Sequence, residues 1–205
     1  MNFLHFIPHV NRPDLTAIAV AATKGTVAEG RVVILDNSAT GEIANQYHLW
    51  GVEVRQATVP LTTAQTMNWI RKMAIEENLD CFGFQHNDGE PAPGTIDKLY
   101  QLASSASTSW GVLFSNYDVC CVFNTQAVIE TGEWDWLRFP FYHLDNDYYY
   151  RLQLAGYPAM ETWLPCKHHN DASNTIKSDP LRRLVNEFTF SASAQLLQQK
   201  WGRPV

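Results

Sequence analysis

Acidic residues follow two apolar runs of the chain, each at the point where a predicted strand ends. ILDNSATG places Asp36 and Asn37 there, and FQHNDGEPAPG places Asp88 and Glu90. A carboxylate after a buried strand can accept hydrogen bonds from a nucleobase or a ribose. Acids beside a tight turn can hold Mg²⁺ or Mn²⁺, which often share a site with phosphate oxygens. Asx-turns and solvated Asn-Asp-Gly turns explain the same residues without a ligand, so both interpretations stay open.

Two further acids, Asp145 and Asp147, lie in a stretch crowded with aromatic side chains, FPFYHLDNDYYYRLQLAGYP. Burying a carboxylate is costly unless it is paired, hydrogen-bonded or bound to a metal. A helix cap accounts for one acid, because Asp145 or Asn146 can cap the helix that follows. The preceding segment, EWDWLRFPFYHL, predicts an aromatic loop that lines a pocket. A partly desolvated acid in such a pocket can act as a general base.

The late stretch CKHHNDAS supplies His168, His169 and Asp171. Adjacent histidines are often ordinary loop residues. Beside a carboxylate cation site, however, one imidazole can complete the set of ligands.

Strands and helices that alternate along most of the chain must position these residues. The alternation indicates an α/β sheet that is largely parallel in its first half. In open α/β sheets ligands bind beyond the carboxyl ends of the strands, so the turns that begin at Asp36 and His86 are expected to meet at one edge. We expect strands within 3–8, 31–41, 52–60, 81–94 and 159–165, and two strands followed by a short helix within 110–132. Helices are expected within 14–25, 62–80, 95–106, 145–158 and 179–202, with Asp14 as a cap and at least one break in the last helix.

The composition, with 45% hydrophobic residues, suits one globular domain over residues 1–205. The net charge is −6 and no run of Lys or Arg occurs, which argues against nucleic acid as a partner. An anionic ligand would then need a metal, a helix N-terminus or a few arginines. No apolar run approaches the ~20 residues of a membrane span. We also expect no signal peptide, free buried thiols and a cytoplasmic location.

In chain order, four segments resemble the inverting GT-A glycosyltransferases, close to family 2 and nearest to its rhamnosyltransferase-like branch. They are LDNSAT, HNDGEPAPG, GEWDW with YHLDNDYYYRLQLAGYP, and HHNDAS, and the resemblance covers roughly residues 1–175. The chain departs from the family pattern at His86, where the first acid of the metal turn is expected, and at Leu144, where a Glu precedes the base. Asp135-Trp136 replaces an Asp-Glu pair, so a contact to the acceptor is expected to differ.

The resemblance implies a GT-A fold, with a mixed, mostly parallel central sheet flanked by helices. It implies metal-dependent, inverting transfer of a hexosyl or deoxyhexosyl group from a nucleotide-diphosphate sugar, with a UDP-sugar favoured, to a hydroxyl of a glycan or glycoprotein. The implied site has Asp145 as catalytic base and Asp88, Glu90 and His168 around Mn²⁺ or Mg²⁺; Pro8, His9, Asp36, Asn37, Asn87 and Asp88 at the donor; and Trp134, Trp136, Tyr142 and Asp147 at the sugar and acceptor.

Three other functions remain to be weighed. A metal-dependent hydrolase could use His86, Asp88 and His168, and it would cleave without an acceptor. A non-catalytic sugar-binding module would explain the aromatic residues and predicts binding without turnover. A sugar-nucleotide pyrophosphorylase is disfavoured, because IPHVNRPDL has no Gly-rich loop with Arg or Lys after the first strand.

Overall fold

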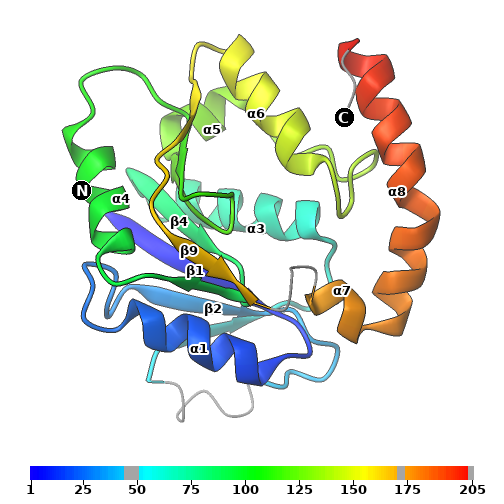
Figure 1. Cartoon of the computed structure of the whole chain (residues 1–205), viewed down its shortest axis with the longest axis horizontal. Helices are drawn as coiled ribbons and strands as arrows, with labels where there is room; N and C mark the ends of the chain where they lie inside the picture. The colour runs from blue at the N-terminus through cyan, green and yellow to red at the C-terminus, as the bar shows by residue number, and fades with distance from the viewer. Residues whose placement is uncertain (44–50, 170–173, 203–205) are drawn as a thin grey trace.

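The computed structural model describes residues 1–43, 51–169 and 174–202, and its α/β elements are coloured along the chain in Figure 1. The strands are β1 (Phe3–His9), β2 (Val32–Asp36), β3 (Glu53–Gln56), β4 (Cys81–Gln85), β5 (Gly89–Pro91), β6 (Val112–Phe114), β7 (Cys120–Asn124), β8 (Ala159–Glu161) and β9 (Cys166–His168). The helices are α1 (Pro13–Thr23), α3 (Thr63–Glu76), α4 (Thr95–Ser105), α5 (Thr125–Thr131), α6 (Leu144–Leu154), α7 (Asn174–Ser178) and α8 (Pro180–Trp201).

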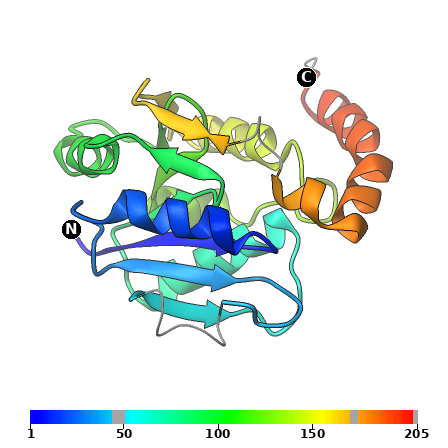
Figure 2. The ribbon, with the colours of Figure 1, turned by 60° about the horizontal axis from the view of Figure 1, so that its bottom comes forward.

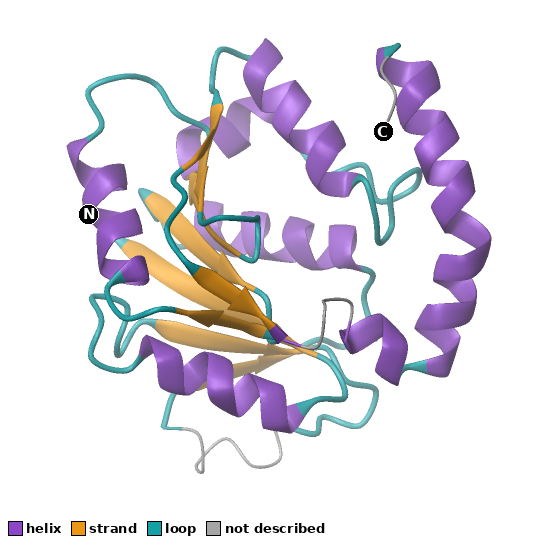
Figure 3. Ribbon diagram, in the orientation of Figure 1, coloured by secondary structure: helices purple, strands orange, loops and turns teal. Residues whose placement is uncertain are grey.

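Seven strands form the central sheet in the order β3-β2-β1-β4-β7-β6-β8. The pairs β3–β2, β2–β1, β1–β4 and β6–β8 are parallel, whereas β7 runs antiparallel to both of its neighbours. Figure 3 shows this sheet flanked by helices. The predicted mixed, mostly parallel sheet is therefore confirmed. A second, two-stranded sheet pairs β5 with β9, and the sequence analysis expected neither strand.

The alternation of side chains along β1 and β4 explains why helices cover both faces of the sheet. Phe6 and Phe82 point into one core with α3, while Phe3 and Cys81 point into another with α4. A third cluster joins Ile7 to α1. In Figure 1, α1 lies in front of the sheet and α3 behind it. Strands buried on both faces are continuous apolar runs, which is how they were visible in the sequence.

Local signals set most helix boundaries, but two predictions were wrong. Thr62 and Gln65 form the capping box of α3. Asp14, by contrast, does not cap α1, because Arg12 occupies the N-cap position and Pro13 begins the helix. The predicted break in the tail is absent, since α8 runs without interruption from its Asp179 cap.

Helix α8 lies along one flank of the molecule, apart from the central strands, in both views (Figures 1 and 2). Asp147 on α6 anchors its far end. The Asp147 carboxylate is completely buried, lies 2.7 Å from Lys200 Nζ, and accepts a hydrogen bond of 2.9 Å from Trp201 Nε1. Arg151, one turn further along α6, donates another bond of 3.0 Å. The predicted substrate contact at Asp147 was wrong, because this carboxylate is buried and its partners are Lys200 and Trp201 of α8 and Arg151 of α6.

No helix among residues 1–43, 51–169 and 174–202 is both long and apolar enough to cross a membrane.

We predict that Asp147→Asn lowers the free energy of unfolding by about 3 kcal/mol, because it leaves two cations without their buried partner. Urea denaturation measures the change. Asp135→Asn is the matched control, since Asp135 also pairs with Lys200 but is more exposed, and it should cost less. Equal stability of Asp147→Asn and the native protein would refute the anchoring role.

Candidate active site

A cavity of about 280 Å³ opens where the strands end. Its walls come from the ends of β1, β2 and β4, from the N-terminal turns of α3 and α6, and from the late segment that contains β9, α7 and α8. The lining residues are Pro8, Val10, Asn37, Thr63, Thr66, Met67, Phe84, His86, Asn87, Asp88, Asp118, Phe123, Trp134, Phe141, Tyr142, Leu144, Asp145, Tyr149, His168, Ile176 and Arg182. The turns after β2 and β4 meet at this edge, as the topology predicted.

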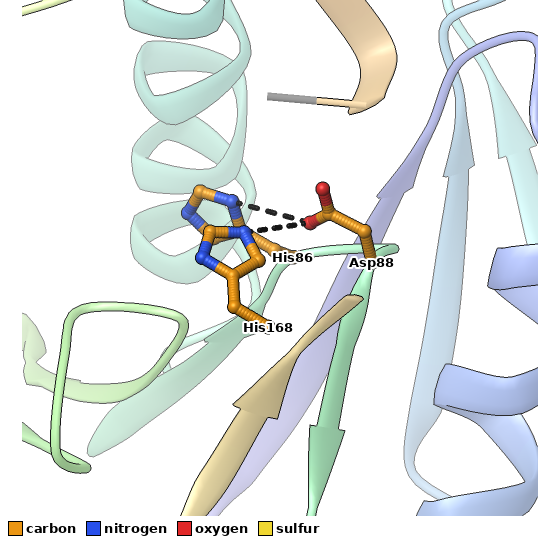
Figure 4. Close-up of side chains that lie close together, drawn as sticks. All are labelled: His86, Asp88 and His168. Atoms are coloured by element: carbon orange, nitrogen blue, oxygen red, sulfur yellow. Dashed lines mark hydrogen bonds and ion pairs between the residues drawn. The ribbon is translucent and has the colours of Figure 1, made fainter. Parts of the chain in front are cut away.

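Three side chains at the cavity wall form a candidate metal centre (Figure 4). His168 Nε2 lies 3.0 Å from Asp88 Oδ1, and His86 Nδ1 lies 3.8 Å from the same oxygen. One donor atom from each residue falls within 4.8 Å of the others. Asp88 is buried, and the two imidazoles are half-buried. Two nitrogens and one carboxylate oxygen converge as the ligands of a divalent transition metal do.

The pairing of β5 with β9 creates this convergence. Its register sets Gly89 opposite His168, and the backbone N–H of His169 donates to the carbonyl of Asp88 at 2.8 Å. Gly89 itself packs against Val119 so closely that an added Cβ would lie 2.5 Å from Val119 Cγ1. A side chain at residue 89 would therefore push β5, and Asp88 with it, away from the sheet.

Glu90 does not belong to this cluster, so its prediction as a metal ligand was wrong. Its carboxylate accepts from His169 Nε2 at 2.8 Å and lies 3.9 Å from Lys167 Nζ. The register explains the difference, because it sets Glu90 opposite Lys167 and beside His169 rather than beside His168. His86 takes the third place in the cluster. Asp171, the other acid of the late segment, lies outside the described residues.

Asp145 lies at the cavity wall in the first turn of α6, half-buried. It does not cap that helix, and neither does Asn146. His143 holds the N-cap position with a positive φ of 61° and no side-chain cap bond. Burial, followed by the charge and the hydrogen bond of the neighbouring Asp118 carboxyl, raises the pKa of Asp145 to about 7. Asp145 is thus a carboxyl tuned to exchange a proton near neutral pH.

Other predicted donor contacts divide into two groups. Pro8, Asn37 and Asn87 line the cavity. Asp36 does not, because Ser38 and the backbone N–H of Ile43 donate to its two buried oxygens. His9 is equally buried, with ring nitrogens 2.7 Å from Thr16 Oγ1 and 3.0 Å from Glu42 Oε2. The donor contacts predicted for Asp36 and His9 do not fit these positions.

The predicted aromatic platform is only partly assembled. Tyr142 and Trp134 line the cavity. Trp134 is nevertheless 2% exposed and stacks on Tyr148 with ring centroids 3.6 Å apart, so it is mainly a core residue. Trp136 is 46% exposed and lines a separate surface hollow with Lys200, so its predicted place in the substrate site was wrong.

The sequence analysis missed two ionisable residues of the cavity. Asp118 precedes β7, where the stretch SNYD has the composition of an ordinary turn. Arg182 lies in the first turn of α8, inside a regular helical pattern. Neither position carries a local signal, because only the tertiary fold brings them to the strand ends.

Comparison with known proteins supports the fold. The sequence matches no family model and no curated protein. Glucosyl-3-phosphoglycerate synthase from Mycobacterium tuberculosis, solved with Mn²⁺, UDP-glucose and glycerol 3-phosphate, is similar with a TM-score of 0.67 and 13% identity, over 100% of this chain and 81% of that one. TarS of S. aureus is similar with a TM-score of 0.63 and 11% identity, over 100% of this chain and 44% of that one.

A cytidylyltransferase from Leptospira borgpetersenii is also similar, with a TM-score of 0.58 and 12% identity, over 98% of this chain and 95% of that one. The fold is therefore the GT-A-like fold shared by nucleotidyl- and glycosyltransferases. The cavity lies at the strand ends, where open α/β sheets bind ligands.

We predict that Asp145→Asn stabilises the protein above neutral pH. The folded state raises the pKa of Asp145 from 3.8 to about 7, so the native protein loses stability as pH rises through that interval. Asparagine cannot ionise and escapes this loss. The unfolding free energy of the variant should exceed that of the native protein by about 4 kcal/mol more at pH 8 than at pH 4.

Asp135→Asn is the control for this measurement. Burial is the largest single effect and raises the pKa of Asp135, but the hydrogen bonds from Arg138 and the charges of Arg138 and Lys200 together outweigh it and lower that pKa. Its titration therefore lies below the interval, and its effect on stability should be nearly constant from about pH 5 upward. A pH-independent difference for Asp145→Asn would contradict the tuned carboxyl.

Proposed function

We propose that this protein is a metal-dependent glycosyltransferase that moves a sugar from a nucleotide-diphosphate sugar to an acceptor hydroxyl. One observation carries the proposal: a three-residue metal centre and a carboxyl with a pKa of about 7 face the same cavity at the strand ends. Transfer requires both chemistries, one for the diphosphate that leaves and one for the hydroxyl that attacks.

His86, Asp88 and His168 would hold the metal. Imidazole nitrogen suits transition metals better than Mg²⁺, which prefers oxygen ligands and strict octahedral geometry. The donor set therefore favours Mn²⁺ over Mg²⁺. A divalent ion there supplies positive charge against the diphosphate, which an acidic protein with a net charge of −6 otherwise lacks.

Pro8, Asn37 and Asn87 would border the nucleotide, since they line the cavity beside the metal centre. A UDP-sugar is the favoured donor, in keeping with the UDP-glucose bound by the M. tuberculosis enzyme. The transferred group would be a hexose or deoxyhexose, the latter matching the rhamnosyltransferase-like motifs of the sequence.

Asp145 would be the general base. Its carboxylate takes the proton of the acceptor hydroxyl while that oxygen bonds to the anomeric carbon and the bond to the diphosphate breaks on the opposite face. The anomeric configuration inverts. Burial and the neighbouring Asp118 keep the pKa of Asp145 near neutrality, so that the base can both accept the proton and release it. The acceptor would be a glycan or glycoprotein. Residues 1–205 would form a single catalytic domain, located in the cytoplasm.

A metal-dependent hydrolase is the second candidate, because the structure assembles the three residues that such an enzyme would use. The two functions differ in their need for an acceptor. A hydrolase releases sugar from a UDP-sugar and water at full rate, whereas a transferase accelerates when an acceptor hydroxyl is added.

We predict that UDP binds in the presence of Mn²⁺ at least about ten-fold more tightly than with Mg²⁺ or with no metal. Asp88→Asn should abolish the Mn²⁺ dependence, because it removes the carboxylate of the metal centre. Isothermal titration calorimetry of UDP, GDP and dTDP, with each ion in turn, measures both effects and identifies the nucleobase of the donor.

Glu90→Gln is the matched control, since Glu90 lies two residues from Asp88 but outside the metal centre. It should bind UDP·Mn²⁺ as the native protein does. Failure of every nucleotide to bind native protein with Mn²⁺ would end the glycosyltransferase proposal. If Glu90→Gln lost as much binding as Asp88→Asn, the assignment of His86, Asp88 and His168 as the metal ligands would be wrong.

A further inference from the structure

Arg182 is the only Lys or Arg side chain that lines the cavity, as far as the described residues extend. The carboxyl and imidazole groups of the wall are those of Asp88, Asp118, Asp145, His86 and His168. Arg182 comes from α8, while the metal centre comes from β4, β5 and β9. It is thus a second positive group, separate in the sequence from the first.

The Arg182 guanidinium is buried but poorly paired. The residue is 9% exposed. Its one ion pair joins Nε to Asp179 Oδ2 at 3.5 Å, beyond good hydrogen-bond distance. Within the described part of the chain, Nη1 and Nη2 have no hydrogen-bond partner. Four N–H donors of a fixed charge are left to face the cavity.

Asp179 cannot fully compensate the charge of Arg182, because both oxygens of its carboxylate accept other hydrogen bonds. Asp179 Oδ1 accepts the backbone N–H groups of Leu181 and Arg182, each at 3.0 Å, and thereby caps α8. Asp179 Oδ2 accepts from Asn11 Nδ2 at 3.2 Å. Burial lowers the pKa of Arg182 despite the opposing effect of Asp179.

The position on the helix adds to the cost. A cation in the first turn meets the positive end of the helix dipole, where anions are favoured instead. An underpaired guanidinium at that place is stabilised by a ligand that supplies negative charge. The Phe141 ring, with its centroid 5.9 Å from Arg182 Cζ, lies beside the guanidinium.

We propose that Arg182 is the oxyanion-binding residue of the cavity and gives it preference for a substrate that carries a phosphate or a carboxylate. Two parallel N–H donors of a guanidinium match two oxygens of either group. The anion is either the diphosphate of the donor or an acidic group on the acceptor. This role for Arg182 rests on the proposed function, because both use the same cavity.

The test compares Arg182→Gln with native protein in two titrations. In the first, UDP and uridine are titrated with Mn²⁺ present. In the second, inorganic phosphate is titrated into metal-free protein. Loss of about ten-fold or more in UDP affinity, with uridine unchanged, supports the proposal and identifies the donor diphosphate. Unchanged UDP affinity with about ten-fold weaker phosphate binding supports it and identifies the acceptor.

Arg183→Gln is the matched control, since Arg183 is the next residue but is exposed and pairs with Glu187. Arg182→Lys keeps the charge without the fork and should restore part of the affinity, which also covers the case in which Arg182→Gln folds poorly. Equal affinities of native protein and both Arg182 variants for UDP and phosphate would overturn the proposal. If native protein binds no nucleotide at all, the proposed function fails, while the phosphate titration still decides the role of Arg182.

Discussion

The antiparallel pairing of two three-residue strands, β5 and β9, is the interaction on which the candidate site depends. It carries His168 across 80 positions of the sequence to 3.0 Å from Asp88. Gly89 makes the pairing possible, because its bare Cα packs on Val119. The chain then continues into α7 and α8, which bring Arg182 to the same cavity. The candidate metal centre is thus a consequence of one strand pairing.

Charge distribution sets what this cavity can bind. Three carboxyl groups line it, and two of them, Asp118 and Asp145, are close enough that the charge of one raises the pKa of the other. A cavity of that kind repels an anionic sugar nucleotide unless cations offset the repulsion. The metal centre provides one offset and Arg182 the other. Burial and this repulsion together raise the pKa of Asp145, so the same surroundings affect both anion binding and the protonation of that carboxyl.

Local patterns in the sequence predict the central sheet and the polar turns at the ends of its strands. Apolar runs and capping residues indicate β1, β2, β4 and α3, and topology then predicts that Asp88 and Asn37 meet. Local patterns do not predict the direction of each side chain, or the contacts between residues that are far apart in the sequence. Glu90 lies two residues from Asp88, but the pairing of β5 with β9 sets its carboxylate against His169, and His86 takes the third place in the cluster instead. His143, and not Asp145, is the N-cap residue of α6, in a left-handed backbone conformation that a histidine does not predict. Arg182 is visible only once α8 is placed over the cavity.

The central claim is that His86, Asp88 and His168 bind the metal of a nucleotide-sugar site. The most direct measurement is anomalous diffraction at the manganese edge from crystals grown with UDP and Mn²⁺. The account predicts one strong anomalous peak within coordination distance of all three side chains, with the diphosphate of UDP beside it. A peak on Glu90 and His169, or UDP bound away from the strand ends, would contradict it.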